Sequence, residues 1–112
     1  MTKYEKQIKG NFEETLSVLH TNIMDRFSME LVDESDLELG NVKIGVRVYD
    51  KYYFRNGNRT SLNLTIVGEG EDLIISAIGS GGGSGVLFNF SWGAEDDIVS
   101  IVESIVNGLA GE

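Results

Sequence analysis

The sequence predicts an α+β fold: an antiparallel sheet of five to six strands with two helices on one face, in the order β-α-β(4–5)-α. Three observations lead to this class. Apolar residues recur at helical spacing near both ends of the chain, the segments between them alternate apolar and polar residues, and Gly, Asn and Asp separate those segments. Packing both helices on the same face is the simplest way to bury their apolar stripes.

The N-terminal part is expected to form a short strand over residues 4–9 and then a helix. Asn11 is a suitable N-cap, and Glu13 complements the positive end of the helix dipole. The apolar stripe of this helix recurs every three or four residues: Phe12, Leu16, Leu19, Ile23 and Phe27. A weak strand over residues 28–32 and a polar turn over residues 33–36 are expected to follow.

The remaining segments complete the sheet and add the second helix. A long strand is predicted over residues 42–54, and Asn56–Gly57 after it is typical of a type I′ hairpin turn. Three further strands are expected, over residues 60–67 (with Leu62, Leu64 and Ile66 facing inward), 73–78 and 86–92. The second helix is expected over residues 94–107, with Gly108 at its end and a buried stripe of Ile98, Ile101, Val102, Ile105 and Leu109.

Length and composition limit the function. A chain of 112 residues has room for one core, so residues 1–112 are expected to form a single domain. The absence of cysteine excludes disulfides, thiol catalysis and cysteine-ligated metals. A formal net charge of -9 argues against nucleic-acid binding, which needs Lys and Arg to neutralise phosphates. No apolar run approaches the ~20 residues of a membrane span, and no signal-peptide core is visible, so we expect a soluble, cytoplasmic protein.

Positive charges recur every four residues along the long predicted strand. Residues four apart share one face of a strand, so Lys43 and the residues that follow it at this spacing would form a basic ribbon with tyrosines between them. The other face, from Ile44 to Phe54, would point to the core. The ribbon is interpreted as a solvated face, as a protein interface between two copies or with another chain, or as a site for an anionic small molecule. Its candidate binding residues are Arg47, Tyr49, Lys51, Tyr53 and Arg55.

Asp50 interrupts the apolar face of the same strand. Strict alternation places it between Val48 and Tyr52, where burial would raise the pKa of its carboxyl group. The favoured interpretation is a bulge at Asp50–Lys51 that turns the carboxylate to solvent, because an unpaired buried charge is costly. The alternative is a small-molecule pocket between the sheet and the C-terminal helix, lined by Asp50, Tyr52, Phe88, Phe90 and Trp92.

Other residues capable of chemistry have simpler structural explanations. His20 has no partner motif and is interpreted as a half-buried structural histidine. The glycine-rich segment 79–85 lacks the lysine and following helix of a phosphate-binding loop, so a flexible connection between strands is expected. The acidic clusters at 33–38 and 69–72 do not match a calcium loop and are interpreted as solvated turns, with an adventitious Ca²⁺ or Mg²⁺ site as the alternative. No cofactor and no metal site are predicted.

The element order resembles the TATA-binding-protein-like and helix-grip folds, in which a curved sheet wraps a C-terminal helix. The pattern Gly79-Ser-Gly-Gly-Gly followed by Trp92-Gly-Ala-Glu95 is similar to small uncharacterised bacterial proteins. Neither resemblance implies a chemistry.

We therefore expect a small, non-catalytic interaction module that binds a protein partner, or a second copy of itself, through an exposed sheet face. A small-molecule-binding domain is the alternative. An enzyme is not predicted, because no nucleophile, base and metal set can be assembled from these residues.

Overall fold

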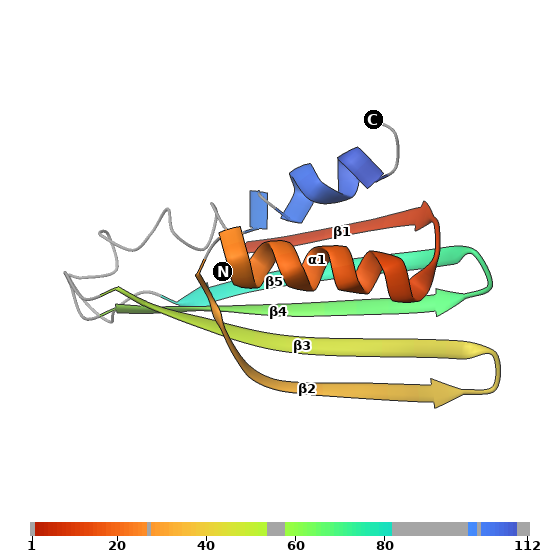
Figure 1. Ribbon diagram of the computed structural model, residues 1–112, viewed down its shortest axis with the longest axis horizontal. Helices are drawn as coiled ribbons and strands as arrows, with labels where there is room; N and C mark the ends of the chain where they lie inside the picture. Colours follow the sequence, from red (N-terminus) through yellow and green to blue (C-terminus); the bar gives the residue numbers. More distant parts are fainter. Residues whose placement is uncertain (1, 27, 54–57, 82–98, 101, 110–112) are drawn as a thin grey trace.

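A computed structural model of the protein describes residues 2–26, 28–53, 58–81, 99–100 and 102–109. It contains an antiparallel five-stranded sheet and two helices, which confirms the predicted α+β class (Figure 1). The elements in chain order are β1 (Thr2–Lys9), α1 (Phe12–Arg26), β2 (Glu30–Leu39), β3 (Val42–Tyr53), β4 (Asn58–Glu69), β5 (Asp72–Gly81) and a C-terminal helix over residues 99–100 and 102–109. No helix in these described ranges is long and apolar enough to cross a membrane.

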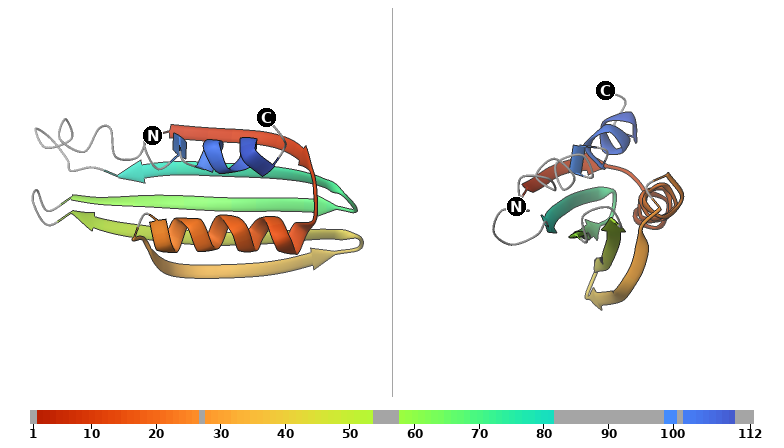
Figure 2. Two further views of the ribbon diagram at one scale, coloured as in Figure 1. Left: turned by 45° about the horizontal axis from the view of Figure 1, so that its top comes forward. Right: turned by 90° about the vertical axis from the view of Figure 1, so that its left-hand side faces the viewer.

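The strands lie in the order β1-β5-β4-β3-β2, and every neighbouring pair is antiparallel. Strands β2 to β5 therefore form a meander, while β1 joins its far edge next to β5. Helix α1 connects the two edge strands and contacts β3 and β4. Both helices lie on one side of the sheet, as the end-on view in Figure 2 shows. On that side, Lys6 Nζ of β1 donates a hydrogen bond to Asn107 Oδ1 of the C-terminal helix at 3.2 Å.

The core lies between this face of the sheet and the two helices. Strands β4 and β5 contribute alternate residues to it, and the predicted inward positions of β4 are confirmed. Glycines at Gly45 and Gly68 let α1 approach the sheet closely, since a Cβ at Gly68 would lie 2.9 Å from Phe12 Cδ2. The C-terminal helix belongs to the same core through Val99, Val102 and Val106. The fully buried hydrophobic residues of the sheet are Tyr49, Leu62, Leu64, Ile66, Leu73, Ile75 and Ala77.

Several predicted boundaries are wrong. Residues 33–36, predicted as a turn, lie inside β2, and the chain instead turns at Gly40, whose φ of 59° favours glycine. Charged residues are tolerated there because β2 is an edge strand with both faces exposed over most of its length. Gly79, Ser80 and Gly81 continue β5 instead of starting a loop, and Gly108 lies within the C-terminal helix. The predicted turn at 56–57, the strand over 86–92 and the start of the second helix lie outside the described residues.

Candidate functional site

Strand β3 faces the helices with the side that was predicted to be exposed. Tyr49 is 0% exposed and Arg47 only 8%, so their assignment to a solvent-facing ribbon is wrong. The strand register explains the reversal, because Arg47 lies opposite Leu64 and Tyr49 opposite Leu62. Residues directly opposite each other in a sheet share a face, so β3 must present these two side chains to the core that β4 defines. Lys51 is partly buried on the same side, while the side chain of Tyr53 and all of Arg55 lie outside the described residues.

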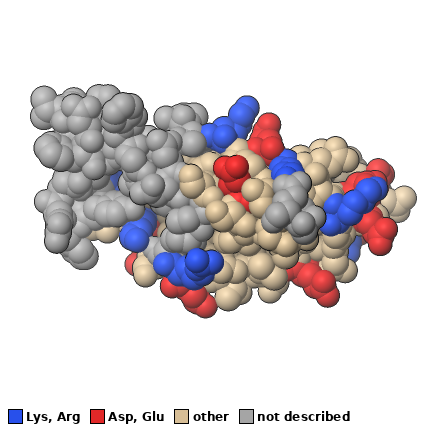
Figure 3. All heavy atoms as spheres, turned by 90° about the horizontal axis from the view of Figure 1, so that it is seen from above, with Lys and Arg blue, Asp and Glu red and all other residues tan. Residues whose placement is uncertain are grey.

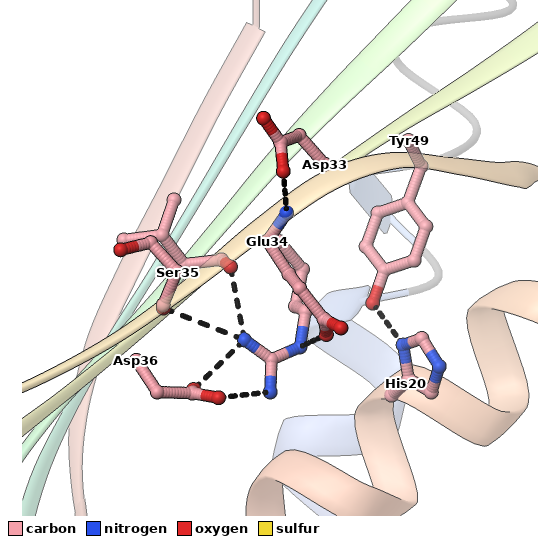
Figure 4. Close-up of polar contacts among 8 residues, drawn as sticks. His20, Asp33, Glu34, Ser35, Asp36 and Tyr49 are labelled. Atoms are coloured by element: carbon pink, nitrogen blue, oxygen red, sulfur yellow. Dashed lines mark hydrogen bonds and ion pairs between the residues drawn. The ribbon is translucent and has the colours of Figure 1, made fainter.

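Arg47 is held by acceptors from the neighbouring edge strand. Its Nε lies 3.0 Å from Glu34 Oε1, and its Nη1 and Nη2 contact the two carboxylate oxygens of Asp36 at 2.9 and 3.4 Å. Nη1 also donates to the carbonyl oxygens of Val46 at 3.0 Å and Ser35 at 3.5 Å. Figure 4 shows Glu34, Ser35 and Asp36 following one another along β2 around these contacts. The bidentate geometry links the edge strand to β3 and engages every nitrogen of the guanidinium group within the protein.

Tyr49 forms a second polar contact, this time with α1. Its hydroxyl oxygen lies 2.7 Å from Nδ1 of His20, and the two ring centroids are 5.7 Å apart (Figure 4). Burial raises the pKa of the Tyr49 hydroxyl, and the nearby positive charge of Arg47 only partly opposes that rise. His20 is half-buried, as predicted. The contact joins the helix to the central part of the sheet, which is a structural function for the single histidine.

We predict that Tyr49 remains protonated at a pH where a tyrosine in water ionises. Because its pKa is raised above the ordinary value of 10.0, the unfolded chain loses this proton first, and stability should fall as the pH rises past 10. Tyr49→Phe should lower the free energy of unfolding by about 0.5–1.5 kcal/mol at neutral pH, because it removes the hydrogen bond. It should also reduce the fall in stability at alkaline pH. Urea melts at several pH values, read beside tyrosinate absorbance, measure both effects. If wild type and Tyr49→Phe lose the same amount of stability at alkaline pH, the prediction is wrong.

A groove of about 480 Å³ lies between α1 and strands β2 and β3. Phe12 and Leu16 contribute apolar surface, and His20 and Arg47 lie along it. At one end Lys43 Nζ contacts Glu13 Oε1 at 2.8 Å, and this hydrogen bond lowers the pKa of the Glu13 carboxyl group. The cations that line the groove are thus already paired with carboxylates. Within the described part of the chain, no three His, Asp or Glu side chains are grouped to hold a metal ion.

The opposite face of the sheet carries neither of the two described helices (Figure 2) and is rich in apolar side chains. We call it the open face. One apolar row, near the turns that join β2 to β3 and β4 to β5, crosses four strands, because Leu37, Ile44, Val67 and Ile74 are successive register partners. Leu37 is 56% exposed and Ile74 48%, and Leu39 at the end of β2 is 78% exposed. The other apolar side chains of this face are half-buried: Val42, Val46, Val48 and Ile78. The predicted burial of Ile44 and its neighbours on this side of β3 is therefore wrong, and the alternation of β3 alone does not reveal this surface.

Asp50 also lies on the open face, which corrects two predictions. The register of β3 with β4 is continuous through Asp50 and Lys51, so the favoured bulge is absent. Alternation does place Asp50 beside Val48, but that face is not the core. Its carboxylate accepts a hydrogen bond from Ser61 Oγ at 2.5 Å and lies 3.5 Å from Arg59 Nη1. Tyr52 lies on the same face and is 49% exposed, so these two residues do not line a pocket beneath the helices.

The other residues of the predicted pocket, Phe88, Phe90 and Trp92, lie outside the described residues.

The charges of the described surface are mixed. Seen from above, acidic and basic side chains are interspersed over the described part of that side instead of gathering into one basic patch (Figure 3). The open face is therefore the candidate site, since a large apolar surface on a folded domain marks an interaction surface more often than isolated exposed residues do.

The chain belongs to a family of unknown function, DUF6054, whose model matches residues 1–110. No curated protein and no solved structure matches it.

Proposed function

We propose that the protein is a small, non-catalytic cytoplasmic module that binds a protein partner through the open face of its sheet. The observation that supports this is the apolar row of Leu37, Ile44, Val67 and Ile74, which runs across four strands on the side away from both helices. An apolar surface of this extent costs free energy in water, and a protein partner would remove it from solvent.

The composition of the open face suits a protein partner better than other ligands. It lies on the outer side of a sheet that curves around the helices (Figure 2), with Thr65 and Ser76 beside the apolar row, so it lacks the concave shape of a small-molecule site. The chain as a whole carries more acidic than basic residues, so its charge opposes binding to the phosphate backbone of a nucleic acid. A small molecule would instead bind in the groove beside α1. This is less favoured, because the charged groups of that groove are already paired with one another.

The test is a charge placed in the apolar row of the open face. Val67→Glu should weaken binding of any protein partner, including a second copy, by more than about tenfold, because a charge would be buried in the contact. Val18→Glu is the matched control, since Val18 is exposed on α1 on the other side of the sheet. Proteins captured from a lysate of the source cells, together with sedimentation of the pure protein, give the readout. Identical capture and sedimentation for wild type and Val67→Glu would refute the proposed function.

A further inference from the structure

We infer that the partner of the open face is a second copy of this chain, docked about a two-fold axis that runs parallel to β4. This inference rests on the proposed function and specifies the partner and the geometry. The axis places β4 over β4 of the partner, β3 over β5, and the edge strand β2 over the edge strand β1. Such an interface is isologous, so each contact occurs twice.

The strand register brings apolar residues together under this symmetry. Because an axis along the strands keeps each residue at its own height, Ile44 faces Ile74 of the partner subunit, and Val67 on the axis faces the partner's Val67. In the next row Val46 faces Ser76 of the partner subunit, and in the row after that Val48 faces Ile78 of the partner subunit. Two of these three rows thus pair apolar side chains of β3 and β5, and the row between them pairs a valine with a serine. Two sheets packed face to face bury alternate residues in this manner in β-sandwiches.

The charges of the two edge strands are complementary in this arrangement. On the open face, Lys3 of β1 and Asp33 of β2 lie at the two ends of one row of register partners. The two-fold axis therefore places Lys3 over Asp33 of the partner subunit, and Asp33 over the partner's Lys3. Face-to-face sheets are rotated by about 30°, which moves positions about 10 Å from the axis by about 5 Å, a distance that a lysine side chain spans. An axis across the strands would instead stack β1 on β1 and β2 on β2, so Lys3 would no longer lie over Asp33 of the partner subunit.

The size of the face also suits a second copy. Five strands about 4.8 Å apart, each about ten residues long at about 3.3 Å per residue, outline roughly 800 Å². A stable protein interface buries roughly 800 Å² on each partner. Glu69 on β4 opposes association, because it would face the partner's Glu69 across the axis. This like-charge contact makes the geometry testable at a single residue.

The experiment is sedimentation equilibrium of the full chain over a wide concentration range. Wild type and Val18→Glu should dimerise, and Val67→Glu should not. Lys3→Glu and Asp33→Lys should each raise the dissociation constant about tenfold, and the double variant should recover most of the loss. Glu69→Gln should lower the dissociation constant several-fold, because it removes a repulsion on the axis. Circular dichroism of each variant confirms that it is folded.

The outcomes separate the partner, the geometry and the proposed function. A wild type that stays monomeric at several hundred micromolar excludes the second copy, while lysate capture lost only in Val67→Glu would still support the open face as a binding surface. Two results would exclude the axis parallel to β4 while keeping the open face as the interface. In the first, Val67→Glu weakens the dimer but charge reversal at Lys3 and Asp33 has no effect. In the second, Glu69→Gln weakens the dimer. A dimer equally stable in every variant excludes the open face altogether.

Discussion

Leu64→Ala should lower the free energy of unfolding by about 3–5 kcal/mol. Leu64 is fully buried in the middle of β4, with Arg47 opposite on one side and Ala77 on the other. Removing its side chain leaves a cavity that these neighbours cannot fill, because both belong to paired strands whose positions are fixed by the sheet. Urea melts, at a protein concentration low enough to keep the chain monomeric, measure the loss.

The matched control is Val46→Ala on β3. Val46 points to the open face and is half-buried, so its truncation should cost less than about 1 kcal/mol. The comparison tests which face of the sheet is the core. A loss of more than about 2 kcal/mol for Val46→Ala, with a small loss for Leu64→Ala, would reverse the assignment of the faces.

Much of the fold follows from local pattern. The stripe of α1 is long and strongly periodic, and its predicted residues Leu16, Leu19 and Ile23 are buried as expected. The inward positions of β4 were also predicted correctly, because they alternate strictly with Ser61, Asn63 and Thr65. In these elements one face is apolar and the other polar, so the periodicity alone decides which face is buried.

Strand β3 lacks that simple pattern, and its orientation depends on its neighbour. One face carries Arg47 and Tyr49 and the other carries Ile44 and Val46, so burial by hydrophobicity alone selects the second face. The sequence does contain a signal against that choice. A two-residue turn at Asn56–Gly57 would pair odd-numbered residues of the first strand with even-numbered residues of the second, which places Tyr49 beside the inward leucines of β4.

The observed register has this same parity, with Tyr49 opposite Leu62. A sheet can bury only one face against the helices, so the apolar face of β3 is left on the outside. The conflict between local pattern and pairing therefore coincides with the candidate site. Such conflicts are expected at functional surfaces, where a sequence serves binding as well as folding. The partners of Arg47 could not be predicted, because Glu34 and Asp36 were assigned to a turn instead of to the strand beside it.

Arg47→Ala is expected to cost about 2–4 kcal/mol, the largest effect of any charged residue in the described part of the chain. The guanidinium is nearly buried, and removing it leaves Glu34 and Asp36 next to each other without their cation. The loss is below that of a fully buried pair because about half of each carboxylate side chain is exposed and can be solvated. The edge strand β2 should also exchange its amide hydrogens faster, since Arg47 joins it to β3.

Two variants separate charge from packing at this position. Arg47→Met keeps an apolar stem against the sheet. It should therefore lose less stability than Arg47→Ala, because the buried part of an arginine side chain contributes to packing. Adding Glu34→Gln and Asp36→Asn to Arg47→Met should recover stability by removing the carboxylate repulsion. Lys43→Ala, which breaks the exposed contact with Glu13, is the control and should have a much smaller effect. If Arg47→Ala is no more destabilising than Lys43→Ala, Arg47 does not hold the edge strand.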